Sequence, residues 1–269
     1  MTLANILVHL DSNPRTAARL ALAVRLAERT GARLTGLFAE TAEAHQVGVV
    51  AVWPSATYAA ALEAARAAFV AGSASVAARA AFIDTNRGSE AEILARVTDI
   101  ARSFDLVILG QTLEGVPVPA KLPEHVITES GRPVLVVPFV GNYPDIGHRP
   151  LFAWRRSRGA ARALADARLV LASGCQALVV EIARVGEDRD EFSDLVLANL
   201  AAHKVAARFQ HTIVEEVDVM DTLLNAASDH SADVLAIGAF DSGGLGLLGH
   251  GAGTRFILSH MTLPVLFSH

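Results

Sequence analysis

The 269-residue sequence has a single cysteine, only two lysines and no excess of positive charge, with a net charge of -5. One cysteine forms neither an internal disulfide nor a CxxC metal site, and this usage is typical of a reducing compartment. Without a basic excess, binding to nucleic acid or to an anionic membrane is disfavoured. No apolar stretch reaches the ~20 residues of a membrane helix, and no leader pattern follows Met1. We therefore expect a cytoplasmic protein that binds neither nucleic acid nor membranes.

The sequence also lacks the local patterns of common catalytic and metal centres. Its ten histidines include no HExxH or HxH spacing, and it has neither a GxSxG elbow nor a Walker GxxxxGK[ST] motif. The sequence therefore predicts no catalytic residue and no metal site. Apolar residues are abundant: 52% of the residues are hydrophobic, and only 19% are charged. This composition indicates a globular chain with a large core.

Two stretches of the sequence occur twice. Residues 105–110 (DLVILG) match residues 233–238 (DVLAIG), and residues 132–136 (RPVLV) match residues 263–267 (LPVLF). In each copy an acidic residue precedes an apolar run that ends in glycine, and a proline opens the next run. Such a repeat predicts two copies of one structural unit.

A segment rich in turn-forming residues separates the two copies. We predict a first domain at residues 1–140, a linker at residues 141–149 and a second domain at residues 150–269.

Short runs of Val, Ile and Leu alternate with longer Ala-rich segments in both copies, which is the pattern of βαβ units. The runs are apolar throughout, as expected for parallel strands that are covered on both faces. The sequence thus predicts an α/β fold of two tandem doubly wound domains, each with a five-stranded parallel sheet. The predicted strands are residues 5–10, 33–39, 81–84, 105–110 and 133–138, then 150–154, 176–182, 206–214, 233–238 and 264–268; the predicted helices include residues 14–30, 56–79, 89–103, 121–130 and 157–173.

In an open parallel sheet, ligands bind beyond the carboxyl ends of the strands where the strand order reverses, near helix N-termini. After the fourth predicted strand of the second copy, residues 238–255 contain seven glycines. Glycine lets backbone N–H groups approach an anion closely. The sequence leaves two readings of this segment open, a phosphate-binding loop and a surface loop whose glycines provide only flexibility.

The repeat and this segment together resemble a tandem universal stress protein, and the resemblance extends over essentially the whole chain. It implies the adenine nucleotide alpha hydrolase-like fold. Nucleotide-binding members carry the motif G-x2-G-x9-G-(S/T) after the fourth strand. Gly238 fits its first glycine, Asp241 stands at the second, and Gly251 fits the third, followed by Ala252. A longer spacer would make Gly253 and Thr254 the final pair.

The same resemblance implies an Asp at the end of the first strand, in contact with the adenosine of ATP. Asp11 holds this place in the first copy, although it could equally cap the next helix. Arg155 stands at the matching place in the second copy, where it could pair only with a phosphate. The first copy has prolines where the family has glycines, so each copy carries half of an ATP site. Four arginines follow the first strand of the second copy and form either an anion-binding surface or a solvated helix start: Arg155, Arg156, Arg158 and Arg162.

These features predict a non-enzymatic stress-response module for binding or signalling. Two versions of it are open: the second domain binds ATP or another small phosphate-containing ligand weakly, or the protein binds no nucleotide at all. The alternative is a nucleotide hydrolase or nucleotidyl-transfer enzyme in which Asp241 would hold Mg²⁺. The resemblance also implies that the two domains pair as a pseudo-dimer through their fifth strands, at residues 134–137 and 265–267. A homodimer of the tandem chain is open as well.

Overall fold

The computed structural model describes residues 2–42, 45–47, 50–52, 55–85, 88–214, 219–240 and 251–269. The chain forms two compact units, Thr2–Pro144 and Asp145–His269. We call them the first and the second unit and describe each by itself.

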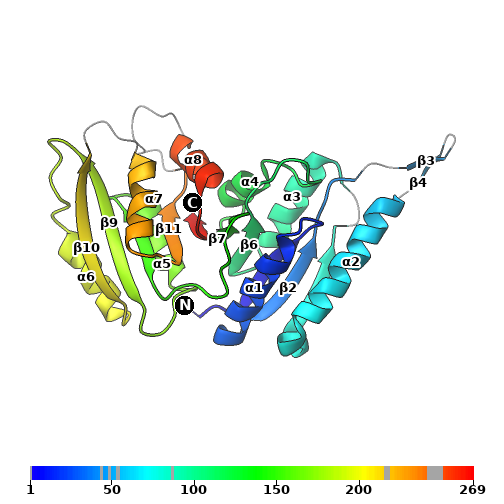
Figure 1. Ribbon diagram of the computed structural model, residues 1–269, viewed down its shortest axis with the longest axis horizontal. Helices are drawn as coiled ribbons and strands as arrows, with labels where there is room; N and C mark the ends of the chain where they lie inside the picture. Colours follow the sequence, from blue (N-terminus) through cyan, green and yellow to red (C-terminus); the bar gives the residue numbers. More distant parts are fainter. Residues whose placement is uncertain are drawn as a thin grey trace. The chain divides into compact units, whose positions relative to one another are not determined.

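The first unit is a parallel sheet covered by helices on both faces (Figure 1). Its elements are β1 (Asn5–Leu10), α1 (Thr16–Thr30), β2 (Arg33–Phe38), β3 (His45–Val47), β4 (Val50–Val52), α2 (Ala56–Gly72), the 3-10 helix η1 (Ala74–Arg79), β5 (Ala80–Asp84), α3 (Glu90–Ala101), β6 (Leu106–Gly110), α4 (Leu122–Glu129) and β7 (Val134–Val137). The strands lie in the order β5-β2-β1-β6-β7 and all pair in parallel, while β3 and β4 form a separate antiparallel pair. Helices α1 and α2 cover one face, and α3 and α4 cover the other.

The second unit repeats this arrangement. Its elements are β8 (Pro150–Trp154), α5 (Arg158–Ala167), β9 (Gln176–Arg184), α6 (Ser193–Ala202), β10 (Ala206–Val214), α7 (Val219–Asp229), β11 (Val234–Gly238), α8 (Ala252–His260) and β12 (Val265–Ser268). The order β10-β9-β8-β11-β12 mirrors that of the first unit, and these neighbours also pair in parallel. The prediction of two tandem doubly wound, five-stranded parallel sheets is confirmed.

The central strands are buried along nearly their whole length. Every residue of β7 and all but the first of β1 are buried, which is why these runs carry no alternating polar residues. Their apolar side chains form the core of each unit, together with one stripe of each covering helix.

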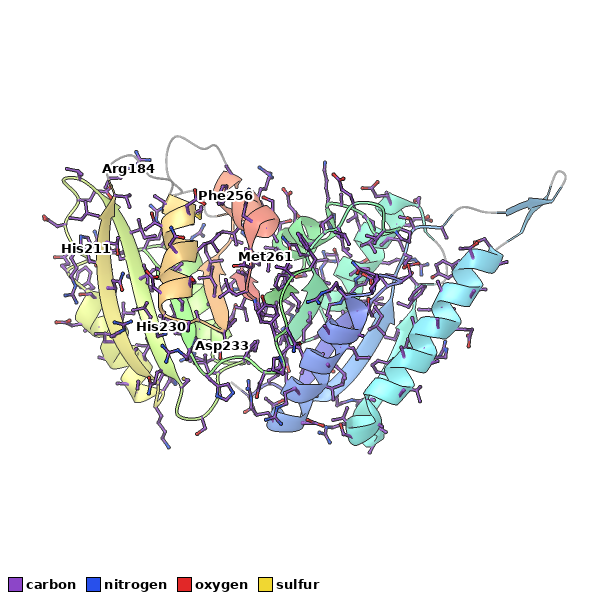
Figure 2. The ribbon with its side chains drawn as sticks, in the orientation of Figure 1. Arg184, His211, His230, Asp233, Phe256 and Met261 are labelled. Carbon is purple, nitrogen blue, oxygen red and sulfur yellow. The ribbon has the colours of Figure 1, made fainter. Side chains whose placement is uncertain are left out.

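The acidic residue of the repeated motif has the same structural role in both units. The Asp105 carboxylate accepts hydrogen bonds from the backbone N–H groups of Ala4 and Asn5, both at 3.0 Å. Asp233 likewise accepts from Gly147, His148 and Arg149, at 3.0, 2.7 and 3.1 Å. Figure 2 shows Asp233 at the opposite end of the sheet from Arg184. The carboxylate therefore ties the entry of the first strand of each unit to the fourth strand.

Two predicted helices end earlier than the sequence suggested. The segment 56–79 divides into α2 and η1, because the chain turns at Ser73, whose hydroxyl donates to the carbonyl of Phe69 at 2.7 Å. In the second unit α5 ends at Ala167 instead of residue 173, and the buried Val170 continues into the core outside the helix.

Candidate functional site

Both units reverse their strand order at the same place. The reversal lies between β1 and β6 in the first unit and between β8 and β11 in the second. The carboxyl ends of these strands are where an open parallel sheet binds ligands. The predicted site residues Asp11 and Arg155 follow β1 and β8, and Gly238 ends β11.

In the first unit this position is occupied by a buried ion pair. Asp11 is 7% exposed and Arg19 is 2% exposed. Their Oδ2 and Nη2 atoms lie 2.9 Å apart. The other oxygen of Asp11 accepts from the backbone N–H of Asn13 at 3.1 Å and from the Thr16 hydroxyl. Both carboxylate oxygens therefore already have donors from the protein.

Arg19 reaches Asp11 from the apolar stripe of α1. It lies among buried residues of that helix, including Leu20 and Ala23, and its Nε donates to the carbonyl of His9 at 2.7 Å. Gly110, at the end of β6, leaves room for the guanidinium, because a Cβ atom there would lie 2.0 Å from Nη1 of Arg19. The sequence analysis missed Arg19. Its place on an apolar helix stripe is a signal that the side chain is buried, although that signal does not identify its partner.

The electrostatics of this cluster follow from burial and from the Arg19 charge. Burial raises the pKa of Asp11, but Arg19 and the surrounding donors outweigh burial and hold that pKa below its ordinary value. Burial lowers the pKa of His9, whose Nε2 lies 2.8 Å from the carbonyl of Ala39. Burial also raises the pKa of Glu40, which accepts from the N–H of Ser12 at 2.5 Å. The cluster is thus an internal network with Asp11 ionised and His9 neutral near pH 7.

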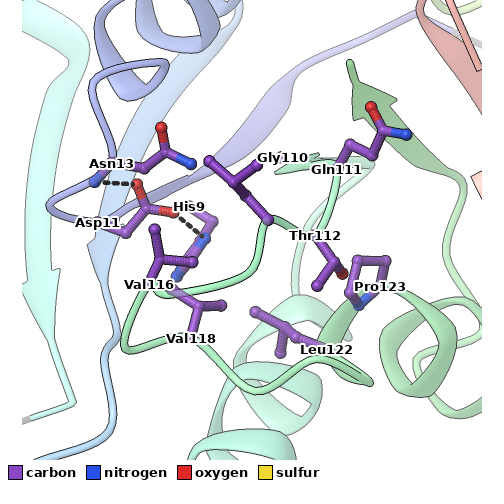
Figure 3. Close-up of a pocket in the computed structure, with 11 residues that line it drawn as sticks. His9, Asp11, Asn13, Gly110, Gln111, Thr112, Val116, Val118, Leu122 and Pro123 are labelled. Carbon is purple, nitrogen blue, oxygen red and sulfur yellow. Dashed lines mark hydrogen bonds and ion pairs between the residues drawn. The ribbon is translucent and has the colours of Figure 1, made fainter. Parts of the chain in front are cut away.

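The segment after β6 closes over this network. Val116 and Val118 line a small pocket together with His9 and Asp11 (Figure 3). The carbonyl of Pro117, between the two valines, accepts from both the N–H and the hydroxyl of Thr41, at 2.7 and 3.1 Å. Apolar side chains thus lie where the resemblance implied a phosphate-binding loop.

In the second unit, Gly238 serves close packing between a helix and a strand. A Cβ atom at Gly238 would lie 2.5 Å from the backbone carbon of Gly159 in the first turn of α5. The N-terminus of α5 therefore lies directly against the carboxyl end of β11. This glycine is needed for packing whether or not a phosphate binds.

The residues at the start of α8 surround the second helix N-terminus at this edge. Gly251 is the N-cap residue in a left-handed conformation (φ 78°), and a Cβ atom there would lie 2.4 Å from the Phe240 ring. The backbone N–H of Phe240 donates to the Thr254 hydroxyl at 3.0 Å and fixes the start of the helix. Ala252 and Gly253 fall in its first turn, where N–H groups have no earlier carbonyl of the helix to bond. Asp241 lies outside the described residues.

The four predicted arginines divide into two kinds. Arg156 pairs with Glu191 at 2.9 Å, and Arg162 pairs with Asp166 at 3.5 Å. Arg155 and Arg158 are exposed and have no carboxylate partner within the part of the chain that the structure describes. These two arginines flank the start of α5.

A polar row crosses the carboxyl ends of three strands of the second unit, and the sequence analysis did not identify it. Trp154, Glu181 and His211 face one another in register on β8, β9 and β10. His211 Nδ1 lies 2.8 Å from Oε2 of Glu181, and the Trp154 indole donates to Asp190 at 2.9 Å. Burial raises the pKa of Asp190, but its donors, Trp154 first, outweigh burial and lower it. The glutamate within an otherwise apolar run was the available signal.

Asp190 belongs to an acidic run, residues 187–191, that precedes α6. In the structure α6 begins only at Ser193, and Asp190 is buried above the polar row. Its carboxylate also accepts from the N–H of Phe192 at 3.0 Å, which orders the approach to α6.

Known proteins match this chain in structure but not in sequence. No protein-family model matches the sequence, and no curated protein is significantly similar to it. A universal stress protein from Archaeoglobus fulgidus superimposes with a TM-score of 0.68 at 14% identity, over 98% of this chain and 95% of that one. The fold is that of a universal stress protein. The resemblance found in the sequence is therefore confirmed at the level of the fold.

Two proteins of Pseudomonas aeruginosa also match over the full length. One, from strain PAO1 and described as functionally unknown, has a TM-score of 0.57 at 16% identity, over 99% of this chain and 92% of its own. The other, from strain UCBPP-PA14 and provisionally named a universal stress protein, has a TM-score of 0.56 at 16% identity, over 99% and 93%. The universal stress protein fold thus extends over both units. The two units differ in what occupies the point where the strand order reverses.

Proposed function

We propose that the chain is a non-catalytic universal stress protein whose second unit weakly binds the phosphate part of a nucleotide such as ATP. We further propose that its first unit binds no nucleotide, and that the protein acts in the cytoplasm as a stress-response module. The observation that carries the proposal is the difference between the two reversal points. In the first unit Asp11 is buried in an ion pair with Arg19. In the second unit Arg155 is exposed and has no carboxylate partner among the described residues.

The chemistry of the second unit favours an anion. The N-termini of α5 and α8 both meet the carboxyl end of β11, through the approach of Gly238 to α5 and the bond from Phe240 to Thr254. Helix N-termini carry partial positive charge and free N–H donors. Arg155 and Arg158 add two full positive charges at the same edge. A phosphate would satisfy these donors together, whereas an uncharged ligand would leave the arginines unpaired.

The second unit has Arg155, not an acidic residue, at the position that matches Asp11 of the first unit. This difference argues for weak binding of a nucleotide. Arg155 donates hydrogen bonds only, so it cannot accept them from the hydroxyls of a ribose. The ligand would then be held mainly through its phosphates. Phosphates without a ribose should therefore compete with ATP for this site.

Calorimetric titration with Mg-ATP tests the proposal. We expect one site per chain, with a dissociation constant of about 0.1–1 mM. Arg155→Glu should weaken binding at least about tenfold, because it replaces an attraction to phosphate by a repulsion. Inorganic triphosphate should displace ATP, and native mass spectrometry should count a single nucleotide per chain.

Arg33→Glu provides the matched control. Arg33 is an exposed arginine of the first unit at the amino end of β2, and the carboxyl ends of the parallel strands lie at the opposite edge of that sheet. This variant should bind ATP within about twofold of the wild type. Absence of binding at millimolar ATP, two sites per chain, or equal affinities in Arg155→Glu and the wild type would each refute the proposal.

A further inference from the structure

Arg155 lies in a short turn that joins β8 to α5. The backbone N–H of Ser157 donates to the carbonyl of Arg155 at 2.7 Å and closes this turn. The Ser157 hydroxyl then accepts from the N–H of Ala160 at 3.2 Å, as the N-cap of α5. The turn therefore places the exposed Arg155 directly beside the start of α5.

The residues on both sides of Arg155 are held by the segment that leads into α6. The Trp154 indole donates to the carboxylate of Asp190 at 2.9 Å. Arg156 donates to Glu191 at 2.9 Å, and its guanidinium lies 5.5 Å from the centre of the Phe192 ring. Arg156 and Glu191 are mostly exposed, and exposed ion pairs contribute little. The bond between Trp154 and the buried Asp190 is therefore the main contact.

Asp190 is itself fixed by the sheet. Its backbone N–H donates to Oε2 of Glu181 on β9 at 3.1 Å, and the same oxygen lies 2.8 Å from Nδ1 of His211 on β10. The carboxylate oxygen that does not contact Trp154 accepts from the N–H of Phe192 at 3.0 Å. Asp190 thus has a position that does not depend on Arg155.

We propose that Asp190 is a positioning residue for the anion site of the second unit, and that its bond to Trp154 holds the turn in which Arg155 meets a phosphate. This role rests on the proposed function. An arginine that is ordered only when the ligand arrives loses conformational freedom at the expense of affinity. A turn that is fixed in advance reduces this loss.

The first unit has an equivalent contact. Glu40 follows β2 and accepts from the N–H of Ser12, which follows Asp11, at 2.5 Å. Strands β2 and β9 are the second strands of their units, and each pairs in parallel with the first strand. Both units therefore use an acidic residue beyond the second strand to fix the turn beyond the first. In the second unit that turn carries an exposed arginine.

Titration with inorganic triphosphate, followed by phosphorus NMR, tests the role of Asp190. Asp190→Ala should weaken binding about three- to tenfold, the range expected when one long side chain must be ordered on binding. Loss of a carboxylate near an anion would by itself strengthen binding, so the sign of the change identifies positioning. Asp188→Ala is the matched control, because it removes the same charge from an exposed position of the same segment. It should bind triphosphate at least as tightly as the wild type.

Trp154→Phe breaks the same hydrogen bond from the other side without a change of charge. It should weaken triphosphate binding by a factor similar to that of Asp190→Ala. Asp190→Asn keeps an acceptor for the indole and should recover part of the affinity. These two variants test the bond even if Asp190→Ala does not fold.

A double-variant cycle shows whether Asp190 acts through Arg155. In an Arg155→Ala background, Asp190→Ala should change triphosphate binding by less than about twofold, because no guanidinium remains to be positioned. A general structural role would weaken binding equally in both backgrounds. That result, or unweakened binding in Asp190→Ala, would overturn the positioning role and leave the proposed function intact. Absence of triphosphate binding by the wild type would overturn both.

Discussion

Asp11 and Arg155 stand at matching places after β1 and β8, but only Asp11 is buried in an ion pair. Removing one partner of a buried pair leaves an uncompensated charge, which costs about 3–5 kcal/mol. We therefore predict that Asp11→Ala lowers the free energy of unfolding by about that amount, measured by urea denaturation with circular dichroism. Arg155→Ala, at the exposed equivalent position, should change it by less than about 0.5 kcal/mol.

A double variant separates the lost charge pair from general disruption of the fold. Asp11→Ala combined with Arg19→Met removes both charges and keeps an apolar chain in the α1 stripe. It should be more stable than Asp11→Ala alone. If the double variant were no more stable, or if Asp11→Ala cost as little as Arg155→Ala, the ion pair would not hold this edge of the sheet.

Glu40 gives the first unit a pH dependence of known sign. Because burial raises its pKa in the folded chain, the protonated form is favoured by folding. The stability that this preference contributes is present below the unfolded pKa of about 4.3 and is lost as the pH rises through the higher folded pKa. We predict that Glu40→Gln, which keeps an acceptor for Ser12, is more stable than the wild type at pH 7, and that the gain shrinks towards pH 4.

Parallel urea titrations of the variant and the wild type at pH 4 and pH 7 measure this difference, because the other titrating groups cancel between the two proteins. A gain that is the same at both pH values would show that the Glu40 charge is not the cause.

The sequence placed Asp11 and Arg155 correctly at strand ends, because apolar runs define where the strands stop. It could not supply Arg19 or Glu40 as neighbours of Asp11. Arg19 comes from the following helix and Glu40 from the end of the next strand, and their meeting depends on the packing of α1 on β1 and on the pairing of β1 with β2. Pairings of this kind arise only in the folded unit.

Among the elements, the contact between α5 and β11 depends on Gly238. The Cβ of an alanine at position 238 would lie 2.5 Å from the backbone of Gly159, which cannot rotate away. We predict that Gly238→Ala lowers the free energy of unfolding of the second unit by about 1–3 kcal/mol. Fluorescence of Trp154 in a Trp53→Phe background follows this unit in urea, since the chain has two tryptophans.

Gly253→Ala is the matched control from the same glycine-rich region. The nearest atoms to its Cβ would all belong to the flexible Met220 side chain, with Cε closest at 2.9 Å. Within a helix, alanine also gains from its higher propensity. The substitution should therefore be neutral or stabilising, and a loss as large as that of Gly238→Ala would contradict this account of the contact.

Most elements could be predicted from the sequence because parallel strands leave long apolar runs. The predicted strands at residues 5–10, 150–154 and 206–214 coincide with β1, β8 and β10. Helix α3 begins with a capping box of Ser89 and Glu92, a pattern that can be recognised in a sequence. The short antiparallel pair of β3 and β4 was not predicted, because three-residue strands are too short for a pattern. The division between α2 and η1 was missed because alanines continue across it.

At the scale of the whole molecule, the duplication preserves the framework and changes what lies at its carboxyl edge. Both units keep the strand order, the acidic residue that ties the first strand to the fourth, and a glycine at the end of the fourth strand. The first unit fills the reversal point with Arg19 and valines. The second unit leaves arginines and two helix N-termini there. A ligand should therefore distinguish two units that share one fold.

Hydrogen–deuterium exchange with and without Mg-ATP tests this asymmetry along the whole chain. A ligand that binds only the folded state stabilises it by about 1.4 kcal/mol at ten times its dissociation constant. We predict slower exchange in the second unit, at the starts of α5 and α8, and unchanged exchange in β1 and residues 111–121. Arg155→Glu should remove the protection at the same ATP concentration. Protection centred on β1 and residues 111–121 would instead show that Asp11 and its surrounding network open to take the nucleotide, and would reverse the assignment of the two units.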